Sequence, residues 1–251
     1  MEKIDSEHNT HADSTTKRAR VLIAEDHALV REGLRAMLAS EPDLQVVGEA
    51  ENGKRAIELC RSLSPEMVLM DVRMPEMDGL EATRKIKEAH PEMIVLMVTS
   101  HQEPDYLLEA VRSGAAGYVL KEATQPELLS AVRSILSGEP ALNQDLAMRL
   151  IARLSAEPAR GREHTSDPPS RRVGAAERVP EALASILSSR EIEALRLVAS
   201  GKTNRQIAKE LMVSLSTIKT HVQRIIKKLG VSDRTQASVK AVELGLLPSE
   251  E

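Results

Sequence analysis

Short apolar segments alternate with amphipathic segments from Arg20 to Gly138. The apolar segments are residues 21–24, 44–47, 67–70, 93–98 and 118–120. Between them apolar residues recur at helical spacing, as in Val30, Leu34, Met37 and Leu38, so each intervening helix would present one apolar stripe. Buried strands joined by helices are typical of a parallel sheet covered on both faces. The pattern predicts an α/β domain with a doubly wound, five-stranded parallel sheet of the flavodoxin-like type.

The pattern changes after residue 138. Residues 141–154 read as one more helix, and residues 156–180 hold Pro158, Pro168, Pro169 and Pro180 among small and charged residues without periodicity. A stretch of this length and composition predicts a flexible linker. We therefore expect a disordered tail at 1–18, the α/β domain at 19–138, a linker helix and flexible linker at 139–186, and a second domain at 187–251.

The second domain is helical in pattern throughout, with Gly201, Gly230 and Gly245 as helix stops. Residues 203–211 and 216–229 predict two helices joined by a tight connection, the second with Ser216 or Thr217 as its N-cap. This spacing indicates a helix-turn-helix in an all-α domain.

The second of these helices has two unlike faces. Ile218, Val222, Ile225 and Leu229 form an apolar stripe that would pack on the domain. A polar and basic face is formed by Lys219, Thr220, Gln223 and Lys227. Such a face is free to enter the major groove of double-stranded DNA.

Composition narrows the classes of function. Phe and Trp are absent and there are only two Tyr, so a protein that stacks on single-stranded nucleic acid has almost no aromatic platform. Cys60 is the only cysteine, which excludes an internal disulfide and a CxxC zinc site. No apolar run approaches the ~18 residues of a membrane span, so we expect a cytoplasmic protein without membrane contact. Acidic residues prevail before residue 139 and basic residues after residue 188, which suggests a cation site followed by a polyanion partner.

Polar residues interrupt the apolar segments where the predicted strands end. Glu25 and Asp26 follow the first strand, Asp71 the third, Thr99 the fourth and Lys121 the fifth. In a parallel sheet these ends meet at one edge, where ligands bind. Three carboxylates there would repel one another unless a cation joined them, and oxygen donors suit Mg²⁺. The set fits phosphoryl transfer to Asp71, with the metal, Lys121 and Thr99 neutralising or binding the phosphoryl oxygens.

These residues carry a family resemblance. The matching motifs are VLIAEDH at 21–27, MDVRMPEMDG at 70–79, VTS at 98–100 and GYVLK at 117–121. Over residues 20 to about 138 the chain resembles the receiver domain of two-component response regulators. Glu122 stands where many receivers have proline, which is common in the NarL/FixJ branch.

The resemblance assigns roles within the acidic site. It implies that Asp71 is the phosphoacceptor, that Asp26 and Asp71 ligate Mg²⁺ directly, and that Glu25 acts mostly through water. The main-chain carbonyl of Arg73 would complete the metal site. Thr99 and Tyr118 would form the conformational switch.

The C-terminal domain resembles the LuxR-type DNA-binding domain over residues 187 to about 244. The matching motifs are LSSRE at 187–191, GKTNRQIA at 201–208, STIKTH at 216–221 and LGV at 229–231, with Arg234. The resemblance implies a four-helix fold with base-edge contacts from Lys219, Thr220 and Gln223. It also implies DNA-backbone contacts from Lys202, Asn204, His221 and Lys227, although His221 could equally be a partly buried packing residue.

Together these features predict a two-component response regulator that accepts a phosphoryl group on Asp71 and binds promoter DNA, as a homodimer once phosphorylated. No kinase or P-loop signature is present, so the phosphoryl group would come from a partner histidine kinase. The chain is not expected to be an enzyme, because haloacid-dehalogenase phosphatases need a second Asp where this chain has Arg73. The alternative is a DNA-binding regulator whose receiver-like domain acts without phosphorylation.

Overall fold

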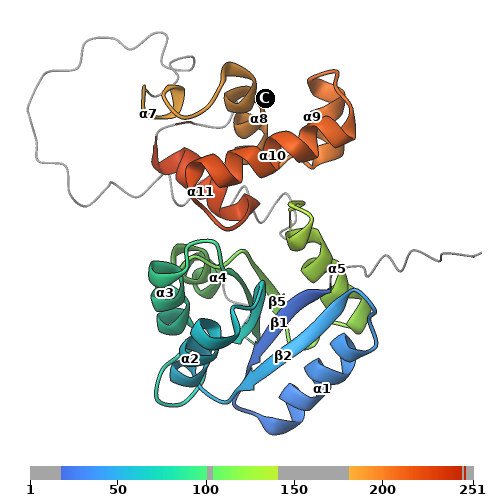
Figure 1. The fold of residues 1–251 in the computed structure, drawn as a ribbon, viewed down its shortest axis with the longest axis vertical. Coiled ribbons are helices and arrows are strands. Elements are labelled where there is room, and N and C mark those ends of the chain that lie inside the picture. The colour runs from blue at the N-terminus through green and yellow to red at the C-terminus, as the bar shows by residue number, and fades with distance from the viewer. Residues whose placement is uncertain (1–17, 101–103, 141–180, 245, 247–251) are drawn as a thin grey trace, which may run out of the picture.

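The computed structural model describes residues 18–100, 104–140, 181–244 and 246. Within these ranges an α/β domain is followed by a smaller helical domain, and each has its own hydrophobic core (Figure 1). Residues 1–17 of the tail predicted at 1–18, the helix predicted at 141–154 and the flexible linker predicted at 156–180 lie outside the described residues.

The first domain is built on one parallel sheet with the strand order β2-β1-β3-β4-β5. The strands are β1 (Ala19–Ala24), β2 (Leu44–Ala50), β3 (Met67–Asp71), β4 (Ile94–Thr99) and β5 (Gly117–Leu120). All four neighbouring pairs are parallel, with Leu69 opposite both Ile23 and Leu96 at the centre. The predicted doubly wound, five-stranded architecture is confirmed.

Five helices cover the two faces of the sheet (Figure 1). They are α1 (Ala28–Ala39), α2 (Gly53–Leu63), α3 (Gly79–Ala89), α4 (Pro104–Arg112) and α5 (Gln125–Leu136). Because strand side chains alternate, Leu22 of β1 packs in the core that includes α2, α3 and α4, whereas Ile23 packs in the core with α1 and α5. Cys60 is fully buried in the first of these cores, and burial raises the pKa of its thiol to about 12.

The second domain consists of helices around one core. They are α7 (Glu181–Ala184), α8 (Ser189–Ala199), α9 (Asn204–Glu210), α10 (Leu215–Leu229) and α11 (Arg234–Glu243). The apolar stripe of α10 enters this core through Ile218, Val222 and Ile225, as predicted. Leu183 of α7 is also fully buried in it, so packing of this domain begins before residue 187.

The start of α10 differs from the prediction. The expected N-cap, Ser216 or Thr217, is wrong, because Ser214 is the cap and its Oγ accepts a hydrogen bond from the Thr217 amide at 3.1 Å. The apolar pattern starts only at Ile218, and an exposed Leu215 gave no periodic signal for the first turn. The predicted stop is confirmed, because Gly230 takes the left-handed conformation with φ 66° at the C-cap.

No helix in the described ranges has both the length and the apolar character needed to span a bilayer.

Candidate functional site

The polar residues predicted at the carboxyl edge of the sheet do meet there. Asp71 is the last residue of β3, Thr99 the last of β4, and Glu25 follows β1. All three are buried, with exposed fractions of 4%, 1% and 0%. Burying two carboxylates side by side is costly unless they are paired, so the site must supply a counter-charge.

Lys121 supplies that counter-charge. Its Nζ lies 2.7 Å from Glu25 Oε2 and 3.0 Å from Asp71 Oδ2, so one ammonium bridges both carboxylates. Its main-chain N–H donates to the carbonyl of Thr99 at 2.9 Å, which ties the end of β5 to the end of β4. Lys121 and Thr99 are therefore held beside Asp71, as the sequence predicted.

The protonation behaviour of the pair follows from burial and charge. Burial raises the pKa of the Glu25 carboxyl; the Lys121 hydrogen bond opposes this, and the charge of Asp71 adds to it. Burial lowers the pKa of the Lys121 ammonium, but its hydrogen bonds to Glu25 and Asp71 outweigh burial, so the pKa is raised overall. The site therefore keeps a protonated lysine against acidic groups.

A third acidic residue adjoins this pair. Ligand atoms of Glu25, Asp26 and His27 lie within 4.8 Å of one another, and His27 Nδ1 is 3.0 Å from Asp26 Oδ1. Oxygen donors of this kind suit a hard divalent cation such as Mg²⁺. His27 was not among the predicted site residues, although its position next to Asp26 was the available signal.

Arg73 and Tyr118 lie at the border of the site. The Arg73 guanidinium donates to the Tyr106 hydroxyl at 2.8 Å, so the metal role predicted for Arg73 concerns its main-chain carbonyl alone. Tyr118 is half-buried in β5 and packs against α4 in a small apolar cluster with Leu107, Leu108 and Val111. The predicted switch residue thus lies between the acidic edge and the surface of α4.

The predicted reading face of the helix-turn-helix is exposed on α10. Lys219, Thr220, Gln223 and Lys227 are all exposed, whereas His221 is partly buried. His221 Nδ1 is itself buried and has no hydrogen-bond partner among the described residues. Four of the five residues predicted on this helix can therefore be reached by a ligand approaching α10.

Two predicted backbone-contact residues are engaged inside the domain. The Asn204 side chain is fully buried and accepts from Arg234 Nη1 at 2.8 Å, and Arg234 also donates to the Lys202 carbonyl. Lys202 Nζ is 2.7 Å from Glu210 Oε2. The Asn204 side chain is therefore used within the domain, and the Lys202 ammonium is shared with Glu210. Burial lowers the pKa of Arg234 to about 10, and its structural role was not predicted.

The two domains contact each other through α11 (Figure 1). Thr235 Oγ1 donates to the Ala116 carbonyl at 2.7 Å, and Gln236 Nε2 donates to the carbonyls of Val111 and Ala115 at 3.1 and 2.8 Å. Val239 packs on the apolar cluster that contains Tyr118. No pattern in the sequence indicates this contact, because polar residues on a helix normally face water.

A buried acid stabilises the helical domain. Glu191 forms a capping box with Ser188, and its Oε2 lies 2.7 Å from Lys228 Nζ. Burial opposes the charged form, but the Lys228 and Ser188 hydrogen bonds prevail and lower the pKa of Glu191 to about 2. Because this pKa is depressed, the stabilisation is complete above the ordinary value near 4.5 and is lost as pH falls through about 2.

Glu191→Gln should therefore destabilise the helical domain by about 1–2 kcal/mol at pH 7, and by less near pH 3. Hydrogen exchange of α8 and α10, followed by mass spectrometry, would measure this. Glu193→Gln is the control, because Glu193 is exposed on the same helix and pairs with Arg190 at 2.8 Å. Equal protection in both variants at pH 7 would contradict the role given to Glu191.

Comparison with known proteins agrees with this geometry. Residues 21–133 match the response regulator receiver domain, and residues 185–241 match the luxR family of bacterial regulatory proteins. The transcriptional regulatory protein LiaR of Bacillus subtilis (strain 168) is 37% identical over 222 residues, which are 88% of this chain and 96% of LiaR. The response regulator protein VraR of Staphylococcus aureus (strain NCTC 8325 / PS 47) is 35% identical over 228 residues, 91% of this chain and 98% of VraR.

A solved structure is similar to this chain over about half of its length. The two-component response regulator of the LuxR family from Aurantimonas sp. SI85-9A1 is 36% identical, with a TM-score of 0.50 over 55% of this chain and 98% of that one.

A receiver domain with its acidic edge, joined to a helix-turn-helix, defines the class of two-component response regulators. Within that class this chain belongs to the LuxR/NarL family of response regulators, to which LiaR and VraR are similar. A receiver domain implies a histidine kinase partner, and the LuxR-type domain implies DNA binding.

Proposed function

We propose that this protein accepts a phosphoryl group on Asp71 from a partner histidine kinase and binds promoter DNA in response. The observation that carries the proposal is the buried Asp71 carboxylate, held 3.0 Å from Lys121 Nζ at the edge of the sheet beside Thr99. As a regulator of transcription it would act in the cytoplasm, where its DNA is. The phosphoryl group stays on the protein, so the domain is a phosphoacceptor and not an enzyme acting on a separate substrate.

The chemistry needs little beyond positioning and charge. A carboxylate oxygen of Asp71 attacks phosphorus, a P–O bond forms as the P–N bond of the donor phosphohistidine breaks, and the imidazole leaves with the electron pair. Lys121 and the Thr99 hydroxyl would bind the phosphoryl oxygens. Mg²⁺, held by Asp26, Asp71 and the Arg73 carbonyl with Glu25 acting through water, would neutralise further charge there.

DNA would be read by the exposed face of α10. Lys219→Ala and Gln223→Ala should each weaken binding to the specific site by roughly 1–3 kcal/mol, because each would remove a contact to a base edge. Lys202→Ala should weaken binding to all sequences alike, since a phosphate contact carries no sequence information. Competition binding with specific and scrambled duplexes measures both quantities. Unchanged affinity and selectivity in both α10 variants would reject this helix as the reader.

Coupling between the two activities would pass through Thr99 and Tyr118. A phosphoryl group gives the Asp71 side chain about two negative charges in place of one and draws the Thr99 hydroxyl toward it, which gives Tyr118 room to turn inward. Tyr118 belongs to the apolar cluster on which Val239 of α11 packs, so a turn of its ring would disturb that contact. Release of α11 would free the helical domain to bind DNA, and two copies on adjacent half-sites would gain affinity from each other.

The test compares mass in solution and operator affinity with and without a small phosphodonor, in the wild type and in Thr99→Ala. We expect phosphorylation to raise both quantities in the wild type and to raise them much less in Thr99→Ala. If the wild type is labelled but neither quantity changes, the phosphorylation-independent alternative is correct.

A further inference from the structure

The end of α5 reaches the helical domain at a defined position. The Gly138 amide donates to the Ile135 carbonyl at 3.0 Å and the Glu139 amide to the Ser134 carbonyl at 2.8 Å, while Gly138 takes φ +73°. This is a Schellman motif, in which a left-handed glycine closes the helix and fixes the residue after it. Glu139 is therefore placed by α5.

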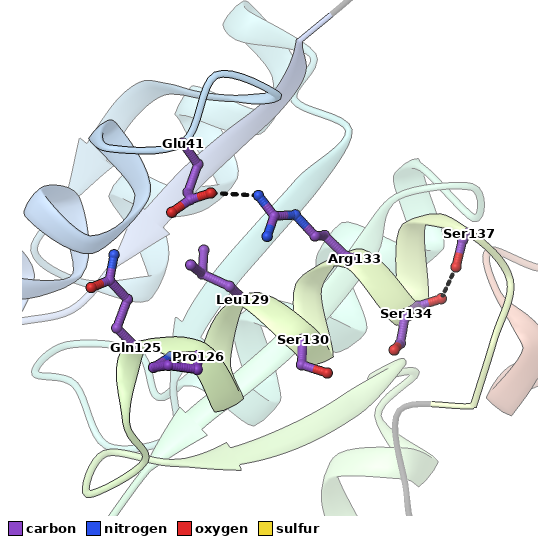
Figure 2. A pocket seen from close by; sticks show the side chains of 8 residues that line it. All are labelled: Glu41, Gln125, Pro126, Leu129, Ser130, Arg133, Ser134 and Ser137. Atoms are coloured by element: carbon purple, nitrogen blue, oxygen red, sulfur yellow. Dashed lines mark hydrogen bonds and ion pairs between the residues drawn. The ribbon is translucent and has the colours of Figure 1, made fainter.

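Helix α5 is itself fixed to the receiver. The Arg133 guanidinium lies 2.5 Å from Glu41 Oε2 and 2.7 Å from Asp43 Oδ1, which ties α5 to the segment between α1 and β2. Figure 2 shows the Glu41 contact and, toward the end of α5, the hydrogen bond from the Ser137 hydroxyl to the Ser134 carbonyl. The receiver domain therefore fixes the positions of residues 138 and 139.

These two residues touch the predicted DNA-binding face. Glu139 Oε2 accepts from the Asn204 amide at 3.4 Å, and Glu139 Oε1 is 3.9 Å from Lys219 Nζ. A Cβ on Gly138 would lie 2.9 Å from Gln223 Nε2, so the glycine backbone rests against that side chain. Gly138 and Glu139 of the receiver therefore lie against three residues that are predicted to contact DNA, namely Asn204, Lys219 and Gln223.

The surroundings of the Glu139 carboxylate are those that a DNA phosphate would require. They comprise an ammonium on α10 and a main-chain N–H at the start of α9, which are ordinary donors to phosphate oxygens in DNA complexes. The negative charge of Glu139 also acts on Arg234, where it partly offsets the effect of burial on the guanidinium pKa. The carboxylate is partly buried, with 25% of its side chain exposed, so water does not fully screen it.

We propose that Glu139 is an internal substitute for a DNA phosphate: in the unphosphorylated protein its carboxylate occupies Lys219 and the Asn204 amide, and DNA must displace it to bind. The proposal rests on the proposed function, since it assumes that α10 reads DNA. The proposal adds that the Glu139 carboxylate competes with DNA for the Lys219 ammonium and the Asn204 amide. Gly138 serves the same arrangement, because its left-handed φ of +73° favours glycine and a Cβ there would force the end of the Gln223 side chain to move.

The first experiment uses the full-length protein and a duplex selected from a random pool with the phosphorylated wild type. Glu139→Gln keeps the shape of the side chain and removes its charge. It should raise the affinity of the unphosphorylated protein for this duplex about three- to tenfold and leave the affinity of the phosphorylated protein unchanged. Glu139→Asp, which keeps the charge but shortens its reach, should give a smaller increase.

Glu32→Gln is the matched control, since Glu32 is exposed on α1 and pairs with Arg35 at 3.6 Å, far from the helical domain. If Glu139→Gln and Glu32→Gln bind the duplex with the same affinity while the wild type still responds to phosphorylation, Glu139 does not compete with DNA and the proposed function stands. Failure of the phosphorylated wild type to select any duplex would instead overturn the proposed function.

A second measurement needs no DNA. A zero-length carbodiimide reagent should join Glu139 to Lys219 in the unphosphorylated wild type, and peptide mass spectrometry would detect the amide. The cross-link should diminish when the phosphodonor is added. Its absence from the unphosphorylated protein would overturn the proposal whatever the DNA result.

Discussion

Asp71→Asn should abolish phosphorylation, which in the wild type attaches one acid-stable, base-labile phosphoryl group from a small phosphodonor in the presence of Mg²⁺. The carboxamide lacks the negative oxygen that attacks phosphorus, so the loss should be complete. Asp71 is one of the two carboxylates that Lys121 bridges, and the other, Glu25, is fully buried. Intact-protein mass spectrometry after brief incubation measures the added group directly.

Asp43→Asn is a suitable control, because Asp43 lies before β2 and pairs with Arg133 away from the acidic edge. It should be labelled as the wild type is. Equal labelling of the Asp71→Asn protein would show that the phosphoryl group resides elsewhere and would refute the assignment of the acidic edge.

Gly79→Ala should destabilise the receiver by about 2–4 kcal/mol, the cost of an overpacked core position. A Cβ on Gly79 would lie 1.9 Å from the Asp71 carbonyl oxygen and 3.0 Å from Met70 Cγ. The Gly79 amide donates to the Val72 carbonyl at 2.9 Å, which holds the start of α3 against the end of β3. Because the obstacle is backbone, no side-chain rotation can relieve the clash, and the end of β3 that carries Asp71 must shift.

Gly33→Ala is the matched control. Gly33 is inside α1 and a Cβ there would meet nothing within 4 Å, so alanine should stabilise the helix by up to about 1 kcal/mol. Thermal unfolding followed by circular dichroism should place Gly79→Ala some 10–20 °C below the wild type and Gly33→Ala slightly above it. Equal melting temperatures for the wild type and Gly79→Ala would mean that the close approach to Asp71 is not tight in solution.

Local patterns were sufficient for most of the fold. The apolar runs predicted all five strands, most clearly β3, because a strand buried on both faces is apolar almost throughout. The position of Asp71 and Lys121 at strand ends then fixed the edge at which they meet, because parallel strands share a carboxyl edge. The start of α10 was misplaced because a cap depends on a single hydroxyl, and three hydroxyl residues, Ser214, Ser216 and Thr217, compete there.

By itself the sequence determined the two domain types, the acidic edge and the basic face of α10, since each follows from residues that are close in the chain or from the geometry of regular elements. Only the tertiary structure decided that Asn204 is buried against Arg234, that α11 lies on the cluster around Tyr118, and that Glu139 reaches Lys219. These contacts join segments far apart in sequence. No periodicity marks them, because each depends on a few side chains whose meeting is set by how whole elements pack.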